Sequence, residues 1–263
     1  MTTSAHKSLF LLLIAATMAL TGCGEMWDFE VKEPVAPASL TLPRRVLTIV
    51  EGDSYTVPVG FTVQGDLQSP PTVPTVYWQS ADETIALFTA GTLHAVGEGI
   101  AKAVVRSAVG SLKDSCVVCV LPPFQVANSD FAYDMVVYAS VDIHGTPLTT
   151  ANADDYVIGA YVGDHLRGIG RVLQSHGRQY LELRVWSPFP SGETVTVRCY
   201  FRGQARMELF ADSIAFDGAM HGTLSQLYPL VLDEQAREYV PNLDSIDYNP
   251  IIDEGDTIRI VIQ

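Results

Sequence analysis

Short segments rich in β-branched and aromatic residues recur along most of the chain, and they limit the folds that are open to it. Tyr55–Val59 and Tyr180–Trp186 alternate apolar and polar residues, and Gly, Pro, Asp and Asn stand between such segments. This pattern is typical of the strands of a β-sandwich or barrel. No long stretch repeats its apolar residues at the helical period. The sequence therefore predicts an all-β fold.

The first residues have the features of a secretory signal peptide. Lys7 precedes an apolar run, 9–20, that is too short to span a bilayer core of about 30 Å. The run ends in Leu20-Thr21-Gly22-Cys23, which resembles the lipobox of bacterial lipoproteins. The resemblance implies cleavage before Cys23 and several acyl chains on its thiol, whereas one chain alone would hold only weakly. We therefore expect a signal peptide at residues 1–22 and a lipoprotein anchored in the outer membrane.

Residues 23–37 form the expected tether between the lipid and the first domain. Gly24–Glu30 is rich in acidic residues and resembles the label by which some Gram-negative bacteria export lipoproteins to the cell surface. A solvated flexible linker explains the same residues, so a surface-facing and a periplasm-facing protein both stay open. Pro34–Ala38 predicts a stiff, extended connection.

The charge and the cysteines exclude several classes of partner and site. A formal charge of −14 disfavours nucleic acid and anionic membrane surfaces, so we expect membrane contact through the lipid anchor. Beyond Cys23 the chain has Cys116, Cys119 and Cys199, an odd number for a disulfide framework. Cys116 and Cys119 have C-x-x-C spacing, but residues three apart in a strand point to opposite faces. We therefore expect buried thiols, and neither a metal site nor another cofactor.

A tryptophan-containing pattern marks the first domain, which we place at residues 38–121. The pattern consists, in order, of Trp78, Ser80, Asp82, Ala86, Gly91, Leu93, Ala95, Gly97 and Gly99. It resembles a group 2 bacterial immunoglobulin-like domain, which implies an immunoglobulin-like β-sandwich used in adhesion or as a spacer. Trp78 is suited to fill the space between two sheets. Ser80–Glu83 predicts a turn whose side chains bond their own backbone, and the insert Gln64–Pro74 predicts a longer loop.

Leu121-Pro122-Pro123 predicts the end of the first domain, because two prolines favour an extended connection. Residues 124–263 predict a second β-sandwich domain, with its last strand at Thr257–Gln263. Within it, Ile158–Gly168 resembles a module found in surface and secreted proteins of Gram-negative bacteria. That resemblance implies a location more than a chemistry.

Common catalytic motifs are absent from the sequence. There is no H-E-x-x-H, no Gly-x-Ser-x-Gly elbow and no P-loop. We therefore expect a non-catalytic protein. A hydrolase whose catalytic residues are scattered along the chain is the less favoured alternative.

The turn that contains Asp164, His165 and Arg167 is the first candidate for ligand contact. It follows a predicted strand, and the loops at the ends of a sandwich are where binding residues concentrate. Asp154, Asp155 and Asp164 would offer oxygen ligands to calcium if they lay close together. A solvated acidic loop is the simpler explanation, so no metal site is assigned.

Aromatic residues of the second domain are further candidates for contact with a glycan or a protein. They are Tyr156, Tyr161, Tyr180, Trp186 and Phe189. Tyr180 and Trp186 share one face of a strand, which we expect to be the core face. The favoured function is adhesion or binding of a glycan or protein ligand, with the immunoglobulin-like domain as spacer. The alternative is a structural subunit of an envelope assembly that has no ligand.

Overall fold

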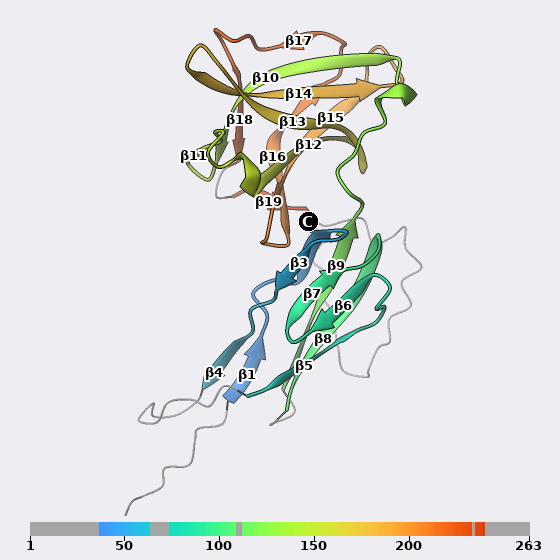
Figure 1. Ribbon diagram of the computed structural model, residues 1–263, viewed down its shortest axis with the longest axis vertical. Coiled ribbons are helices and arrows are strands. Elements are labelled where there is room, and N and C mark those ends of the chain that lie inside the picture. Colours follow the sequence, from blue (N-terminus) through green and yellow to red (C-terminus); the bar gives the residue numbers. More distant parts are fainter. Residues whose placement is uncertain (1–36, 64–73, 109–111, 233–234, 240–263) are drawn as a thin grey trace, which may run out of the picture.

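The computed structural model describes residues 37–63, 74–108, 112–232 and 235–239. The signal peptide, Cys23, most of the tether and of the insert, and the expected strand at 257–263 therefore lie outside the described residues. The described part is all-β, with two sandwiches arranged end to end (Figure 1). Helix in this part is limited to two 3₁₀ turns, η1 (Asn128–Asp130) and η2 (Ala153–Asp155). None is long and apolar enough to cross a membrane.

The first sandwich has the immunoglobulin-like arrangement that the sequence predicts. Its strands are β1 (Pro37–Thr41), β2 (Val46–Val50), β3 (Ser54–Thr56), β4 (Gly60–Val63), β5 (Val76–Ser80), β6 (Ala86–Thr89), β7 (Thr92–Ala95), β8 (Gly99–Ser107) and β9 (Lys113–Leu121). One sheet has the order β2-β9-β8-β5 and the other β3-β7-β6, while β1 pairs with β4. β2 runs parallel to β9. Leu47, Ile49, Leu93 and Val118 are among the buried residues of its core.

The tryptophan pattern joins the two sheets of this sandwich. Trp78 on β5 stacks on Phe88 of β6, with ring centroids 4.5 Å apart and 2° between the ring planes. Because β5 and β6 belong to different sheets, the stack confirms the predicted position of Trp78 between them. The turn after β5 is closed by its own side chains, as predicted. Asp82 Oδ1 accepts a hydrogen bond from the Thr84 amide at 2.8 Å, and Ser80 Oγ accepts one from the Asp82 amide at 3.2 Å.

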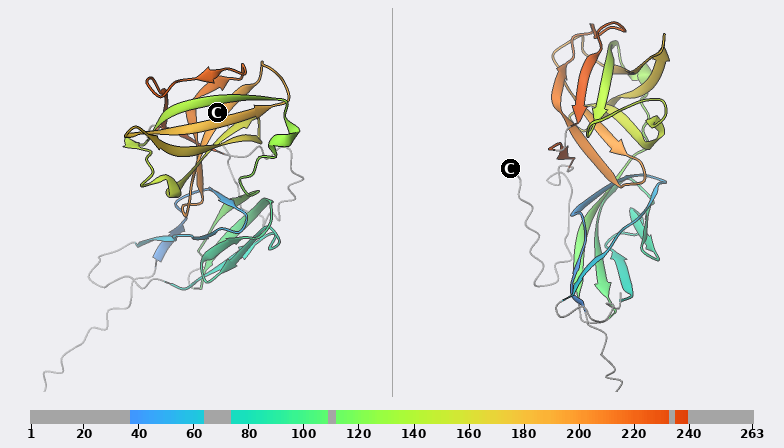
Figure 2. Two further views of the ribbon diagram at one scale, coloured as in Figure 1. Left: turned by 45° about the horizontal axis from the view of Figure 1, so that its top comes forward. Right: turned by 90° about the vertical axis from the view of Figure 1, so that its left-hand side faces the viewer.

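The second sandwich is a run of strands that bends back on itself (Figure 2). Its strands are β10 (Tyr133–Ile143), β11 (Thr146–Pro147), β12 (Tyr156–Val162), β13 (His165–Ser175), β14 (Arg178–Ser187), β15 (Thr194–Phe201), β16 (Arg206–Ala215), β17 (Met220–His221), β18 (Tyr228–Leu232) and β19 (Arg237–Glu238). Their order is β11-β10-β14-β13-β12-β15-β16-β19, and β17 and β18 pair with β10. The first half of β13 pairs with β12 and the second half with β14, so the bend lies within β13.

The expectation that Tyr180 and Trp186 face the core is wrong. On β14 the alternate residues Leu181, Leu183 and Val185 are at most 2% exposed and belong to the core. Tyr180 and Trp186 are half-buried on the opposite face of the strand. The strand does alternate between two faces, but its aliphatic residues form the core face and the two larger rings lie on the other face.

The cysteines form no disulfide in the described part of the chain, and the prediction of buried thiols is confirmed. Cys116, Cys119 and Cys199 are all free and buried. Cys116 belongs to the core of the first sandwich and Cys119 does not, as expected for opposite faces of β9. Burial raises the pKa of each thiol from 9.0 to about 12.

The raised pKa values of these thiols predict that the folded protein loses stability at alkaline pH. An exposed thiol of the unfolded chain ionises near pH 9, whereas the folded chain keeps its protons to about pH 12. The free energy of unfolding should therefore fall as the pH rises through this window, because the unfolded state loses protons first. Urea titrations at about pH 8 and about pH 10.5 measure the fall. A Cys199→Val variant should show a smaller one, and an equal fall in both chains would contradict the assignment.

The two sandwiches are joined by a hairpin of the second that packs into the first. The turn between β15 and β16 places Ala205, which is 1% exposed, in the core of the first sandwich. The carbonyl of Ala205 accepts a hydrogen bond from the Thr48 amide on β2 at 2.9 Å. Arg44 Nη1 donates to the Gln204 carbonyl at 3.2 Å. The hairpin therefore adds backbone hydrogen bonds to apolar contact across the junction.

Tyr200 is the central side chain of this junction. Its hydroxyl donates to Asp53 Oδ2 at 3.0 Å and accepts a hydrogen bond from the Val50 amide at 3.4 Å. Its ring packs in a small apolar cluster with Val50, Val157, Met207 and Tyr239. This cluster also contacts Leu121, Phe124, Ile169 and Leu209. The residues of this cluster come from both sandwiches and from the segment between them. The junction is therefore a packed interface rather than a free hinge.

Candidate functional site

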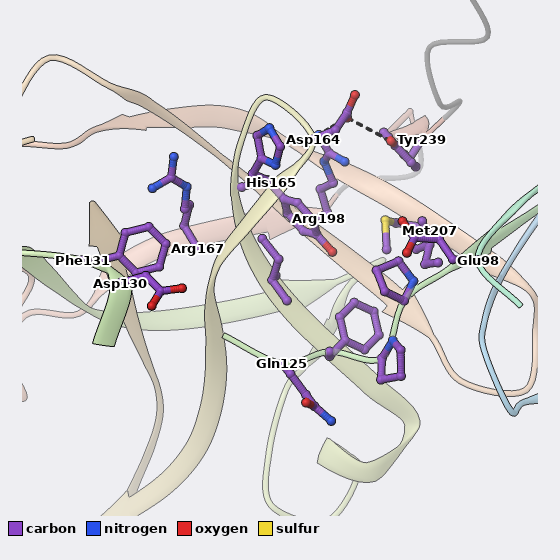
Figure 3. Close-up of a pocket in the computed structure, with 16 residues that line it drawn as sticks. Glu98, Gln125, Asp130, Phe131, Asp164, His165, Arg167, Arg198, Met207 and Tyr239 are labelled. Carbon is purple, nitrogen blue, oxygen red and sulfur yellow. Dashed lines mark hydrogen bonds and ion pairs between the residues drawn. The ribbon is translucent and has the colours of Figure 1, made fainter. Parts of the chain in front are cut away.

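A cleft of about 630 Å³ lies beside this junction (Figure 3). Clefts of roughly 300–1,000 Å³ are typical of sites that hold a small ligand. The first sandwich and the connecting segment supply Glu98, Leu121, Pro122, Pro123, Phe124 and Gln125. The second sandwich and the residues that lead into it supply Asp130, Phe131, Tyr161, Asp164, His165, Leu166, Arg167, Arg198, Met207 and Tyr239. Both sandwiches are therefore needed to form the cleft.

The turn that the sequence singled out lies at this cleft. Asp164 and His165 stand where β12 turns into β13, and Arg167 follows on β13. All three residues line the cleft. In Figure 3 they lie along the upper half of the view, with Arg167 beside Phe131. The side chain of Asp164 is 59% exposed, so one face of the carboxylate is open to solvent. That these residues contact a ligand stays a prediction.

Arg198 is held in the cleft wall by two ring contacts and two hydrogen bonds. Its guanidinium lies between two tyrosine rings, 4.2 Å from the centroid of Tyr161 and 4.1 Å from that of Tyr239. Nη2 donates to the Gly163 carbonyl at 2.6 Å and to Asp164 Oδ1 at 3.1 Å. The hydroxyl of Tyr239 donates to the same Oδ1 at 2.9 Å. The carboxylate of Asp164 and the faces of the two tyrosine rings therefore compensate the buried positive charge of Arg198.

A second arginine stands at the other end of the cleft. Arg167 lies with its guanidinium carbon 4.8 Å from the centroid of the Phe131 ring and its Nη2 3.5 Å from Glu193 Oε1. Its side chain is 13% exposed. Asp130, which closes the 3₁₀ turn η1, is exposed at the same end (Figure 3).

Two buried tyrosines line the cleft, and the hydroxyl of Tyr239 donates to Asp164. Burial, and then the hydrogen bond to Asp164, raises the pKa of Tyr239 to about 12. Burial also raises the pKa of Tyr161 above its ordinary value, against the opposing effect of Arg198. Both hydroxyls therefore keep their protons at neutral pH.

The lining of the cleft does not provide the hydroxyl or thiol nucleophile that many hydrolases use. It contains a histidine and three carboxylates, but no serine, threonine or cysteine among the described residues that line it. His165 is exposed, and within the described chain it has no hydrogen bond to a carboxylate that would orient it. Nucleophilic catalysis needs a nucleophile within reach of an oriented base. The groups present are suited to binding.

Calcium binding by Asp154, Asp155 and Asp164 is not supported. Asp154 and Asp155 lie in η2, before β12, whereas Asp164 follows the other end of that strand. A strand of this length separates its ends by about 20 Å, because each residue advances about 3.3 Å. No group of three His, Cys, Asp or Glu residues that could hold a metal occurs in the described ranges.

Several cleft residues were missed by sequence reasoning. Arg198, Tyr239 and Asp130 come from segments far from the predicted turn, and only the fold brings them to it. Arg198 did leave a signal, because it interrupts the apolar strand β15 and a charged residue in a buried strand needs a partner. Tyr161 was predicted as an exposed aromatic, but it is 6% exposed and stacks on Arg198.

Comparison with known proteins adds only distant likenesses in structure. No protein-family model and no curated protein sequence matches the chain. A solved structure of the S-layer protein SbsC, domains 5–6, is similar over 75% of this chain and 98% of its own, at 14% identity and a TM-score of 0.27. Protocadherin gamma B7 extracellular cadherin domains 1–4 are similar over 68% of this chain and 49% of their own, at 9% identity and a TM-score of 0.23.

Proposed function

We propose that the chain is a non-catalytic lipoprotein, anchored in the outer membrane through Cys23, that binds an extracellular glycan or protein ligand in the junction cleft. The observation that carries the proposal is the position of Asp164, His165 and Arg167. These residues, singled out by sequence, lie in a cleft that both sandwiches build. Polar and aromatic groups converge there, and no serine, threonine or cysteine is among the described residues that line it, which supports a binding role.

The junction changes the role that we propose for the immunoglobulin-like domain. As a simple spacer it would only hold the second domain away from the membrane. Instead it contributes Glu98 and Leu121 to the cleft and buries Ala205 of the second sandwich in its core. We infer that the two domains act as one unit that keeps the two sides of the cleft together.

The anchor and the exposure of the cleft are tested together on intact cells. We expect added protease to digest the wild-type protein from outside, and a Cys23→Ala variant to be found in soluble fractions, because it lacks the acyl chains. Immunoblots after protease treatment and after detergent phase partition measure both effects. A periplasmic protein is the control for membrane integrity. Protection of the wild type until the outer membrane is opened would contradict surface binding and favour a role in a periplasmic assembly.

A further inference from the structure

The cleft presents hydrogen-bond acceptors and donors close together. The carboxylates of Glu98, Asp130 and Asp164 accept, whereas the guanidinium groups of Arg167 and Arg198 only donate. A ligand that satisfies both kinds of group must itself accept and donate. A hydroxyl group does both, whereas a carboxylate or a phosphate ester mainly accepts and an ammonium group only donates.

The charges of the cleft disfavour an anionic ligand. Arg198 is already paired with Asp164 at 3.1 Å and Arg167 with Glu193 at 3.5 Å. Glu98 and Asp130 have no cationic partner in the described part of the chain. The cleft therefore carries excess negative charge, in a protein of formal charge −14.

Two buried donors of the same arginines lack an acceptor. Arg198 Nε and Arg167 Nη1 have no hydrogen-bond partner among the described residues. The Arg198 side chain is only 6% exposed, and buried polar groups are almost always satisfied by protein, water or ligand. Both nitrogens are closed off from solvent in this structure, so a ligand oxygen would reach them only after a small shift of the neighbouring side chains.

Apart from Gln125 and His165, the remaining lining is apolar or aromatic. Phe124, Phe131, Leu166 and Met207 line the same cleft, together with the two prolines of the connecting segment. The C–H faces of a sugar ring pack against such groups, while its hydroxyls reach charged side chains at the rim. A lysine-rich peptide would also offer acceptors through its backbone carbonyls, but its positive charge would make its binding depend strongly on salt.

We propose that the cleft binds a neutral oligosaccharide. This inference rests on the proposed binding function and names the chemical class of the ligand. Donors and acceptors beside apolar surfaces match the hydroxyls and C–H faces of sugar rings, and the negative charge of the cleft selects against acidic glycans.

Calorimetric titration of the full-length lipoprotein in detergent tests the class of ligand. The probes are cellohexaose, xylohexaose, mannohexaose and chitohexaose, with a heparin hexasaccharide and hexalysine as charged comparisons. We expect at least one neutral probe to bind with little dependence on salt. An Asp130→Ala variant should weaken that binding about tenfold, the usual effect of losing a hydrogen bond to a charged group. Asp212→Ala removes an equally exposed carboxylate from β16 and should leave binding unchanged.

The other outcomes separate the two proposals. Salt-sensitive binding of hexalysine that Asp130→Ala weakens, or of heparin that Asp130→Ala strengthens, would overturn the neutral oligosaccharide and leave the binding function in place. Failure of all four neutral probes to bind a chain with a normal circular dichroism spectrum would overturn this inference. Protease accessibility of cells, as described above, decides surface placement independently.

Discussion

Replacing Gly168 by alanine is expected to destabilise the second sandwich by about 3 kcal/mol, the upper end of the usual overpacking range. A Cβ atom at this position would lie 2.2 Å from the carbonyl oxygen of Arg184 and 3.2 Å from the Cα of Val185. These atoms belong to the backbone of β14, so no side-chain rotation relieves the clash. β13 would have to move away from β14 at the point where it bends between the sheets.

A second glycine provides the matched comparison for Gly168→Ala. Gly177 lies in the turn between β13 and β14 at a φ of +77°, and nothing lies within 4 Å of a Cβ built there. Gly177→Ala should therefore cost only about 1 kcal/mol, the penalty of a positive φ for alanine. Urea unfolding followed by circular dichroism measures both losses. Equal destabilisation by the two variants would show that β13 accommodates a side chain at its bend.

The Gly168→Ala variant also tests how the cleft is positioned. Gly168 follows Arg167 directly, and the turn with Asp164 and His165 begins the same strand. A displaced β13 would move these cleft residues relative to Asp130 and Phe131. We therefore expect the variant to lose ligand binding under conditions in which it is still folded, which a calorimetric titration would detect.

Local pattern was sufficient to predict the regular parts of this fold. Strand alternation and turn residues predicted the two sandwiches, and the tryptophan pattern predicted the packing of Trp78 between sheets. The Gly-Asp turn before His165 was located because a turn is a local feature of sequence. Its place at a cleft was not predictable, because other parts of the lining come from the connecting segment and from Tyr239, which follows β19.

Features that depend on pairing distant segments escaped sequence reasoning. Alternation on β14 defined two faces but did not say which one meets the core, so Tyr180 was assigned to the wrong side. Ala205 has no sequence signal at all, since one alanine in a polar turn gives no indication that it is buried in another domain. Both outcomes depend on how the sheets pack against each other. The alternation of residues along one strand carries no information about that packing.

The junction hairpin gives the last prediction. Ala205 has a φ of +46°, a backbone conformation that aspartate and asparagine adopt more readily than other non-glycine residues. Ala205→Asp is therefore tolerated by the backbone, and its effect comes from placing a carboxylate where the side chain is 1% exposed. We expect a penalty of about 3 kcal/mol or more, because a buried charge without a partner is among the most unfavourable substitutions.

This penalty falls on the contact between the domains, because each sandwich keeps its other core residues. We expect calorimetric unfolding to change from one cooperative transition in the wild type to two transitions in Ala205→Asp, since separated domains unfold independently. Ala205→Asn has nearly the same shape without the charge, and it should lower the transition temperature less and keep one transition. A single, unshifted transition for Ala205→Asp would show that the hairpin does not couple the domains. In that case the cluster around Tyr200 would be what holds the domains together at the cleft.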